Sequence, residues 1–450
     1  MKKNLLFVVL VAACAAAIGY KVADKAPSAD LAADDQMLAI IESAGCMDCH
    51  SASPNLPFYA SLPVAGDLVK ADAEKGYRAY NIEPTVKALK EGGLVNEVSV
   101  AMIERVLLKG TMSPAKYYLV HWGAAINDTE RDMAMEWAKT YRAEHYPNPL
   151  AAEEWANETI RPIPDSLAVD SRKVELGKLL FHDGRLSLDN TISCASCHNL
   201  ETGGVDNKQY SEGVGGQFGG VNAPTVFNAY FNFVQFWDGR AATLADQAAG
   251  PPLNPVEMAS ESFEQICAKL QADENMVKMF AEIYPDGITE ANITNAIQEF
   301  EMTLLTPNSP FDRYLKGDND ALSAEEIEGY DLFKENGCAT CHAGETLGGK
   351  TYEYMGRFDN YFEKRGLEMT EEDNGRFKQT KDEYDRHCFK VPGLRNLALT
   401  APYFHDGTMK TIEEAVQAMA HYECGVDLTE QDNQKISAFM RSLTGEYKAK

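Results

Sequence analysis

Three copies of a five-residue motif combine two cysteines with a histidine, and they read CMDCH, CASCH and CATCH. The residues are Cys46, Cys49 and His50 in the first copy, Cys194, Cys197 and His198 in the second, and Cys338, Cys341 and His342 in the third. Two thiols at this spacing can bond the vinyl groups of a porphyrin while the adjacent histidine binds its iron. A zinc ribbon would need two CxxC pairs close together and no terminal histidine. The sequence therefore predicts three covalently bound haem c groups.

The loop that follows the middle motif offers no second iron ligand. It reads SEGVGGQFGG and contains neither histidine nor methionine. Further on, APTVFNAYFNFVQFWDGRAATLADQ (223–247) matches VPGLRNLALTAPYFHDGTMKTIEEA (391–415) at one constant offset. The C-terminal copy carries Met419 just beyond this stretch, whereas the same offset leads to Pro251, which cannot bind iron. We expect Met419 to be the sixth ligand of the third haem and the middle haem to be five-coordinate.

Two polar side chains near the matched segment could do acid/base chemistry. Cleaving a peroxide at an open iron needs a group that takes a proton from one oxygen and returns it to the other. Glu257 lies in the Pro-rich loop GPPLNPVEMASES, and Gln247 ends the matched segment. Each alone is more often an exposed polar residue, but the neighbouring vacant site favours a catalytic pair.

The first motif lies in a segment with the pattern of a small helical cytochrome. Met112 stands in the loop KGTMSPAKYY, which makes it the preferred sixth ligand of the first haem. The alternatives are His121 and the methionines in helical patterns.

The N-terminus has two lysines ahead of an apolar run from Leu5 to Tyr20. We favour an uncleaved anchor over a lipoprotein signal ending at Cys14 and over a cleaved signal. All three export the chain, so we expect it at the periplasmic side of the bacterial inner membrane. The formal charge of -26 argues against binding to nucleic acid.

From about Ile163 onward the chain resembles the bacterial dihaem cytochrome c peroxidases. The resemblance is carried by TISCASCHNLETGGVD, NAPTVFNAYFNFVQFWDGR and VPGLRNLALTAPYFHDG. With its N-terminal additions, the whole chain resembles the trihaem membrane-bound quinol peroxidases. The implied roles are the peroxidatic haem at His198, its acid/base pair Glu257 and Gln247, the electron-transfer haem at His342 and Met419, and Trp237 between the two haems.

The resemblance also implies one Ca²⁺ between the haem domains, held by Asn222, Thr400 and Pro402. Many family members have a histidine in the loop where this chain has Val214, and there it blocks the iron until the other haem is reduced. We therefore expect the middle haem to be ready without prior reduction; His182 is the alternative ligand.

The predicted fold is mainly α, with three cytochrome c-type haem domains in tandem and the last two homologous. The predicted segments are an anchor or signal at 1–22, a tether at 23–35, a monohaem domain at 36–146, a linker at 147–162, a peroxidatic domain at 163–306 and an electron-transfer domain at 307–450. A disulfide between Cys388 and Cys424 is left open, because the sequence does not show that they touch.

These expectations favour an enzyme that reduces hydrogen peroxide to water, with electrons from membrane quinol or a redox protein. One alternative is a cofactor-maturing oxidase that acts on a partner protein; such proteins resemble this chain but have tyrosine where Met419 stands. Another is a non-catalytic electron shuttle, which needs no vacant iron. A homodimer is one arrangement that the resemblance implies.

Overall fold

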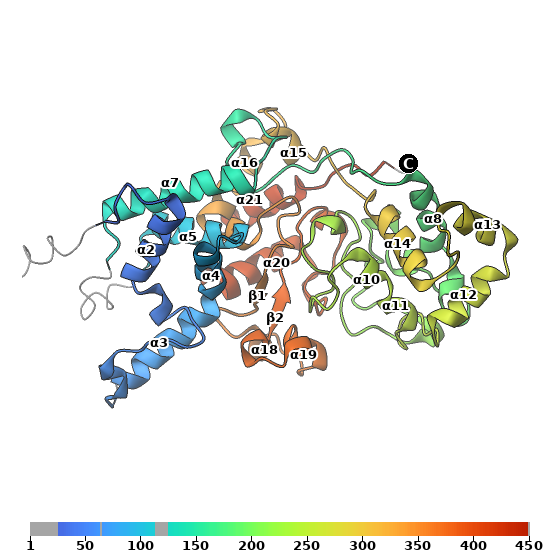
Figure 1. Ribbon diagram of the computed structural model, residues 1–450, viewed down its shortest axis with the longest axis horizontal. Helices are drawn as coiled ribbons and strands as arrows, with labels where there is room; N and C mark the ends of the chain where they lie inside the picture. Colours follow the sequence, from blue (N-terminus) through green and yellow to red (C-terminus); the bar gives the residue numbers. More distant parts are fainter. Residues whose placement is uncertain (1–25, 64, 113–124, 449–450) are drawn as a thin grey trace, which may run out of the picture. The chain divides into compact units, whose positions relative to one another are not determined.

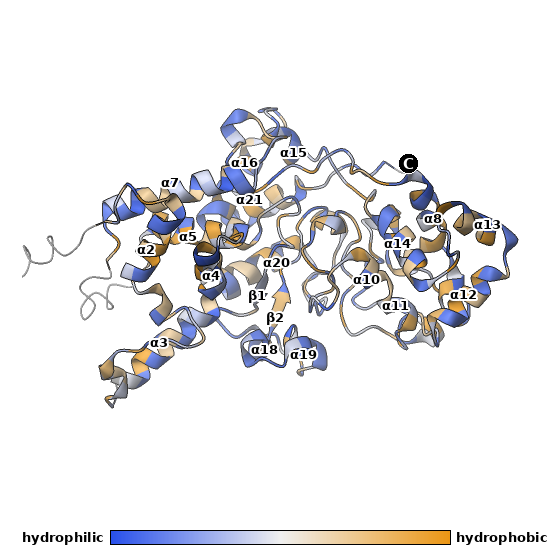
Figure 2. Cartoon of the chain, in the orientation of Figure 1, coloured by the Kyte–Doolittle hydropathy of each residue, from blue (hydrophilic) through white to orange (hydrophobic). Residues whose placement is uncertain are grey.

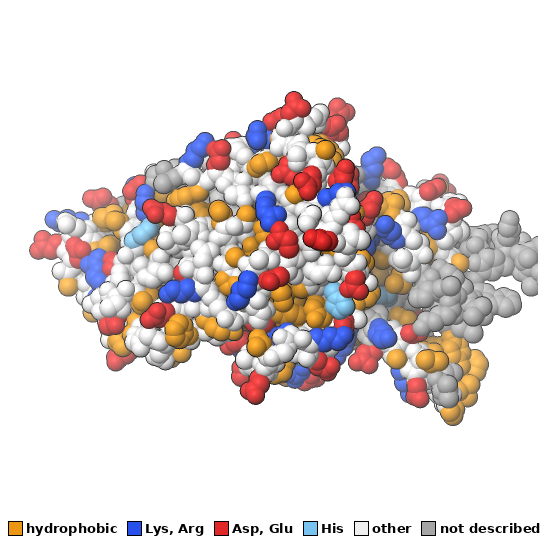
Figure 3. Space-filling model, turned by 180° about the vertical axis from the view of Figure 1, so that it is seen from behind, with side chains coloured by type: hydrophobic (Ala, Val, Ile, Leu, Met, Phe, Trp, Pro, Cys, Tyr) orange, Lys and Arg blue, Asp and Glu red, His pale blue; other side chains and the backbone are white. Residues whose placement is uncertain are grey.

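The computed structural model describes residues 26–63, 65–112 and 125–448. The chain divides into two compact units, Met1–Pro147 and Asn148–Lys450. Both are mainly helical, as the sequence predicts, and the described part has a single two-stranded sheet (Figure 1). The predicted anchor at 1–22 lies outside the described residues. Within the described ranges, no helix has the length and hydropathy needed to span a bilayer. Acidic side chains are spread over the face in Figure 3, in keeping with the formal charge of -26.

In the N-terminal unit, one apolar core is built largely from α2 (Ala33–Ser43), α4 (Glu83–Glu91), α5 (Glu97–Lys109) and α7 (Asp128–His145). The helix α3 (Ala65–Ala79) contributes none of its described residues to this core. Asn127 begins α7 by accepting a hydrogen bond from the Glu130 amide, and the Glu130 side chain accepts one in return. Both α2 and α5 pack against α7, where Trp137 is buried and donates to Asp34 at 2.7 Å. The α2 helix thus starts inside the stretch that the sequence predicts to be a tether.

The second unit contains the other two haem motifs. Its longer helices are α8 (Ser171–Phe181), α12 (Phe263–Gln271), α13 (Glu274–Ile283), α14 (Glu290–Glu301), α16 (Ala324–Glu335), α20 (Ile412–Met419) and α21 (Glu430–Arg441). Its short helices are α9 (Cys194–Cys197), α10 (Leu244–Ala248), α11 (Gly250–Leu253), α15 (Pro310–Leu315), α17 (Cys338–Cys341), α18 (Tyr361–Lys364) and α19 (Phe377–Thr380). The strands β1 (Tyr352–Tyr354) and β2 (Cys388–Lys390) pair antiparallel.

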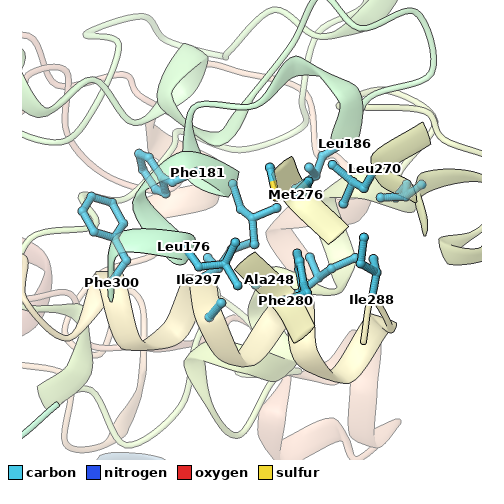
Figure 4. Close-up of a cluster of buried hydrophobic side chains, with 14 of the residues drawn as sticks. Leu176, Phe181, Leu186, Ala248, Leu270, Met276, Phe280, Ile288, Ile297 and Phe300 are labelled. Carbon is cyan, nitrogen blue, oxygen red and sulfur yellow. The ribbon is translucent and has the colours of Figure 1, made fainter. Parts of the chain in front are cut away.

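Two helix pairs in this unit pack in the same way. The α8 helix crosses α14, and α16 crosses α21. Each crossing is close because a glycine lies at the contact: a Cβ on Gly177 would lie 1.9 Å from the Ala296 carbonyl oxygen, and one on Gly329 would lie 2.0 Å from that of Lys435. Side chains from α8 and α14, such as Phe181 and Phe300, fill the core of the first pair (Figure 4). Helices such as α12 carry both hydrophobic and hydrophilic residues, as helices with one buried face do (Figure 2).

The two matched segments adopt matching backbone structures. Each contains an isolated antiparallel bridge, Gln235 with Ala241 in one and Tyr403 with Met409 in the other. Asn228 and Asn396 both have left-handed backbone angles, with φ of 60° each. Their buried amides donate to the same hydroxyl, that of Thr306, at 2.8 and 2.9 Å. The matched segments therefore meet at a single side chain.

The stretch predicted to be a linker is part of the second unit from Asn148 onward. Ala152 donates its amide to the Leu315 carbonyl at 2.9 Å, and the Trp155 ring lies 5.1 Å from that of Tyr314. Ile160 is fully buried in the core around α16 and α21. A Pro-bearing, polar sequence suggested a free linker, but these apolar side chains have a surface to cover.

Candidate haem centres and active site

The histidines of the three motifs share one hydrogen-bonding arrangement. Nδ1 of His50 lies 2.8 Å from the Tyr80 carbonyl oxygen, Nδ1 of His198 lies 3.3 Å from that of Gly204, and Nδ1 of His342 lies 2.8 Å from that of Leu347. A carbonyl oxygen only accepts, so Nδ1 carries the hydrogen and donates it. Nε2 is then the nitrogen with a free lone pair, which is the one that can bind iron.

Burial lowers the pKa of all three histidines and so favours the neutral ring that a metal ligand needs. Each motif forms one helical turn, closed by the histidine amide bonding to the first cysteine's carbonyl oxygen at 2.9 to 3.0 Å. None of the six motif cysteines is joined in a disulfide in the structure. This donor set fits a covalently attached haem c at each motif.

The third motif opens onto a cavity with an apolar lining. Cys338, His342 and Met419 all border it, with Phe333 and Leu394 among the apolar residues around them. Met419 is the last residue of α20, which continues without a break into a π-helical turn, Ala420–Cys424. The structure thus brings His342 and Met419 to one cavity, and their service as the two axial ligands stays a prediction.

The helix of the middle copy stops earlier. Like α20, α10 begins with a capping box, from Thr243 and Asp246, but it ends at Ala248. Pro251 and Pro252 follow in α11, and neither has an amide hydrogen to extend the preceding helix. Gln247, the predicted peroxide-positioning residue, is half-buried near the end of α10.

Glu257 lies beside the middle motif and against the loop that follows it. The Val214 amide donates to the Glu257 carbonyl oxygen at 2.8 Å. Gly213 fits so closely that an added Cβ would lie 2.3 Å from the Val256 carbonyl oxygen. Burial raises the pKa of the thiol of Cys197, one residue before His198, and the negative charge of the Glu257 carboxylate contributes to this rise. The backbone therefore ties the loop around Val214 to the predicted acid/base residue.

The environment of the Glu257 carboxyl shifts its protonation equilibrium. Burial raises its pKa, while Arg240 and a hydrogen bond from the Asn254 amide, at 2.7 Å, act in the opposite direction. The net effect is a raised pKa. A carboxyl group whose pKa lies nearer to neutral pH can both accept and return a proton more readily, which suits a general acid/base.

Trp237 borders the cavity of the third motif. Its Nε1 donates to the Asn222 carbonyl oxygen at 2.9 Å, and its ring lies 6.3 Å from that of His405, edge to face. Its own carbonyl oxygen accepts from the Lys390 amide. Trp237, which belongs to the first matched segment, is therefore hydrogen-bonded to the residues that directly precede the two matched segments.

The residues predicted to bind calcium border the same cavity. Asn222, Thr400 and Pro402 all belong to its lining, and the Asn222 amide donates to the Lys208 carbonyl oxygen at 2.9 Å. In the described ranges, no group of three or more His, Cys, Asp or Glu could hold a metal ion. The predicted site uses amide and carbonyl oxygens instead, so calcium stays a prediction.

Other candidates lie away from these centres or at the edge of the described residues. Met112 is 36% exposed and directly precedes the undescribed stretch 113–124, in which His121 falls. His182 is exposed and bonds to the Lys178 carbonyl oxygen. Cys388 and Cys424 are not joined in a disulfide in the structure, and Cys388 donates to the Tyr384 carbonyl oxygen. None of these observations places a further ligand at an iron.

Sequence reasoning missed a buried charged network around His405. Its Nε2 lies 2.8 Å from Asp373, and Arg365 pairs with both Asp373 and Asp406 at 2.6 and 2.9 Å. The only signal was FHDG in the matched segment, where the middle copy has FWDG and places Trp237 at the position of His405.

Residues 171–320 match a family described as di-haem cytochrome c peroxidase, and residues 8–140 match a haem-binding domain. The cytochrome c peroxidase Ccp of Escherichia coli (strain K12) is 48% identical over 414 residues, which cover 92% of this chain and 88% of that protein. A cytochrome c551 peroxidase of Nitrosomonas europaea is 47% identical over 294 residues, 65% of this chain and 85% of that protein. A solved structure of a MauG-like protein associated with microbial copper homeostasis has a TM-score of 0.57 at 28% identity, covering 64% of this chain and 94% of that chain.

Proposed function

Because the chain belongs to the di-haem cytochrome c peroxidase family, we propose that it is a three-haem enzyme that reduces hydrogen peroxide to water with electrons from membrane quinol. Its relatives make it a haem peroxidase. The observation that carries the finer proposal is the half-buried Glu257, with its raised pKa, beside a CxxCH motif whose following loop supplies no further ligand.

Haem c, when bound, supplies an iron that accepts and passes single electrons and, where one coordination position is open, binds a peroxide. The protein supplies the rest. The His198 ring is held through the Gly204 carbonyl oxygen, so that its neutral Nε2 would be the nitrogen that binds the iron of a haem attached at this motif. The loop around Val214 contains neither histidine nor methionine, so it would supply no such ligand and the site would need no prior reduction.

Glu257 moves the proton. With haem c bound at the middle motif, its carboxylate would accept a proton from one peroxide oxygen and return it to the other, which would leave as water. Asn254 holds the carboxyl by its hydrogen bond, and Gln247 donates a hydrogen bond that positions the peroxide. The complete reaction consumes one peroxide, two electrons and two protons and releases two waters.

Electrons enter at the N-terminal unit and reach the middle site by way of the third motif. Trp237 is on the route because it borders the cavity of the third motif and is held by hydrogen bonds with Asn222 and Lys390. An anchor at 1–22 would hold the enzyme at the periplasmic side of the inner membrane, where quinol is available. One Ca²⁺ at Asn222, Thr400 and Pro402 would stabilise this junction.

The decisive experiment compares peroxide consumption in wild type and Glu257→Gln, with a quinol analogue and with a soluble artificial donor. We expect turnover to fall by the ~10²- to 10⁴-fold typical of lost acid/base catalysis, with unchanged binding of small ligands to the haem. Glu261→Gln removes an exposed carboxyl four residues along the chain and serves as the control. An undiminished rate in E257Q would refute the mechanism, and activity with the soluble donor only would refute quinol as donor.

A cofactor-maturing oxidase is the second candidate, favoured by the likeness to a MauG-like structure. Met419 borders the cavity of the third motif, at the position where cofactor-maturing oxidases have tyrosine, and this favours the peroxidase. If the enzyme with peroxide oxidised a partner protein in preference to quinol, the cofactor-maturing oxidase would replace the peroxidase as the first candidate.

A further inference from the structure

Lys390 is a buried cation at the edge of the cavity of the third motif. It is the last residue of β2, where its amide donates to the Trp237 carbonyl oxygen at 2.8 Å. Lys390 belongs to the cavity lining, and it is only 5% exposed. The strand therefore fixes the lysine backbone at the border of the space that Cys338, His342 and Met419 also border.

In the described part of the chain, no group neutralises this charge. Among the residues that the structure describes, none forms an ion pair or a side-chain hydrogen bond with Lys390 Nζ, and burial lowers its pKa to about 8 without an opposing contribution from a carboxylate. The lining of the cavity contains no aspartate or glutamate. An ammonium group buried without a partner is costly, so such a group usually has an anion beside it.

The other buried cation of the lining makes the contrast clear. Arg395 is 3% exposed and also borders the cavity, but it pairs with Asp312 at 2.7 Å and donates to Ser309 and to the Arg161 carbonyl oxygen. Its guanidinium is satisfied by the protein. Lys390 is the cation that needs a partner from inside the cavity.

We propose that Lys390 binds a carboxylate presented inside this cavity, namely a propionate of the haem c attached at Cys338 and Cys341. Haem c carries two propionates, and the predicted iron ligands His342 and Met419 border the same cavity. The proposal rests on the haem that the proposed function assigns to the third motif. A small free anion offers the same chemistry and is the alternative source.

The pairing would link the haem to Trp237. The amide of Lys390 donates to the Trp237 carbonyl oxygen, and Trp237 is on the proposed electron route. A propionate bound by Nζ would therefore be connected to Trp237 through Lys390 alone. The positive charge would also stabilise the reduced iron, which carries one positive charge fewer than the oxidised iron. Lys390 is thus a positioning residue that raises the reduction potential of this haem.

The test measures the midpoint potential of the third haem by spectroelectrochemical titration of the full-length holoenzyme. Lys390→Met and Lys390→Gln should lower the equilibrium constant for its reduction roughly tenfold, about 59 mV for one electron. Lys390→Arg should change the midpoint potential by only a small fraction of that shift, because the variant keeps the positive charge. Lys435→Met removes a lysine of α21 that is paired with Glu328 of α16, and it controls for the loss of one positive charge from the chain.

Unchanged potentials in both neutral variants, or equal shifts in K390M and K390R, would overturn the proposal. A wild-type potential that depends on chloride or phosphate concentration, with the dependence lost in K390M, would assign Lys390 to a free anion and would equally overturn it. The mass of wild-type peptides containing Cys338 and Cys341 shows separately whether haem is attached there. Absence of that haem would defeat the proposed function, whereas a present haem with an insensitive potential would defeat only the role of Lys390.

Discussion

The hydrogen bond between Asn254 and Glu257 makes a quantitative prediction about pH. The Asn254 amide donates to Glu257 Oε1 at 2.7 Å and so stabilises the ionised carboxylate. Glu257 must be ionised to accept a proton from peroxide. Activity should therefore fall as the pH drops through the pKa of Glu257, and this pKa should be visible as the acid limb of kcat/KM.

The size of the effect follows from the hydrogen bond. A hydrogen bond to a charged group contributes ~1.5–3 kcal/mol, and one pKa unit corresponds to ~1.36 kcal/mol. Asn254→Ala should then raise the pKa of Glu257 by about 1 to 2 units. The acid limb should move to higher pH by the same amount, while the rate at high pH, where Glu257 is ionised in both proteins, should change little.

The assay is steady-state peroxide consumption with a soluble donor over a series of buffers from acidic to alkaline pH. Asn254 also accepts a hydrogen bond from the Val256 amide at 3.2 Å, which Asn254→Asp can keep while losing the amide donor. N254D should therefore shift the acid limb at least as far as N254A. Gln217→Ala, which removes a nearby bond to the Pro255 carbonyl oxygen, should leave it in place. An acid limb that stays fixed in both Asn254 variants would refute the assignment of Glu257 as the base.

Three further outcomes are expected. Met419→Ala should convert one low-spin haem to high spin in the electron paramagnetic resonance spectrum, whereas Met440→Ala, which removes another methionine of the same cavity, should not; identical spectra would show that Met419 is not a ligand. Val214→His should convert the middle haem towards low spin and make activity depend on prior reduction of the third haem, and full activity of the oxidised variant would contradict the open-site proposal. Metal analysis should find one Ca²⁺ per wild-type chain and less in Asn222→Ala, and a calcium-free active wild type would remove that site.

The haem motifs could be recognised from sequence because their chemistry depends on local spacing. Two cysteines and a histidine within five residues form one helical turn whatever surrounds them. The matched segments were visible for a similar reason, since Asn228 and Asn396 need the same unusual backbone angles. The partners of these groups could not be predicted in this way. The carbonyl oxygen that orients His50 comes from Tyr80, thirty residues further along the chain.

Burial was the property that the sequence concealed most. Lysine side chains are mostly exposed in proteins, yet Lys390 is 5% exposed in β2, which pairs with β1 and whose last residue bonds to Trp237. The linker shows the same limit, since only the tertiary structure reveals that Ile160 has a core to enter. Position in three dimensions, and not residue type, decides which charged groups must find a partner.

The shared hydroxyl of Thr306 has a consequence for modularity. It accepts hydrogen bonds from Asn228 in one matched segment and from Asn396 in the other, and all three residues are at most 2% exposed. Thr306 is the last residue of the first half, so separating the two halves would leave Asn228 its partner and would strand the buried amide of Asn396. That loss costs ~1–3 kcal/mol, out of the ~5–15 kcal/mol that stabilises a typical domain. The C-terminal copy therefore depends on the other half for the partner of a buried amide, and it would lose that partner if it were transplanted into another protein alone.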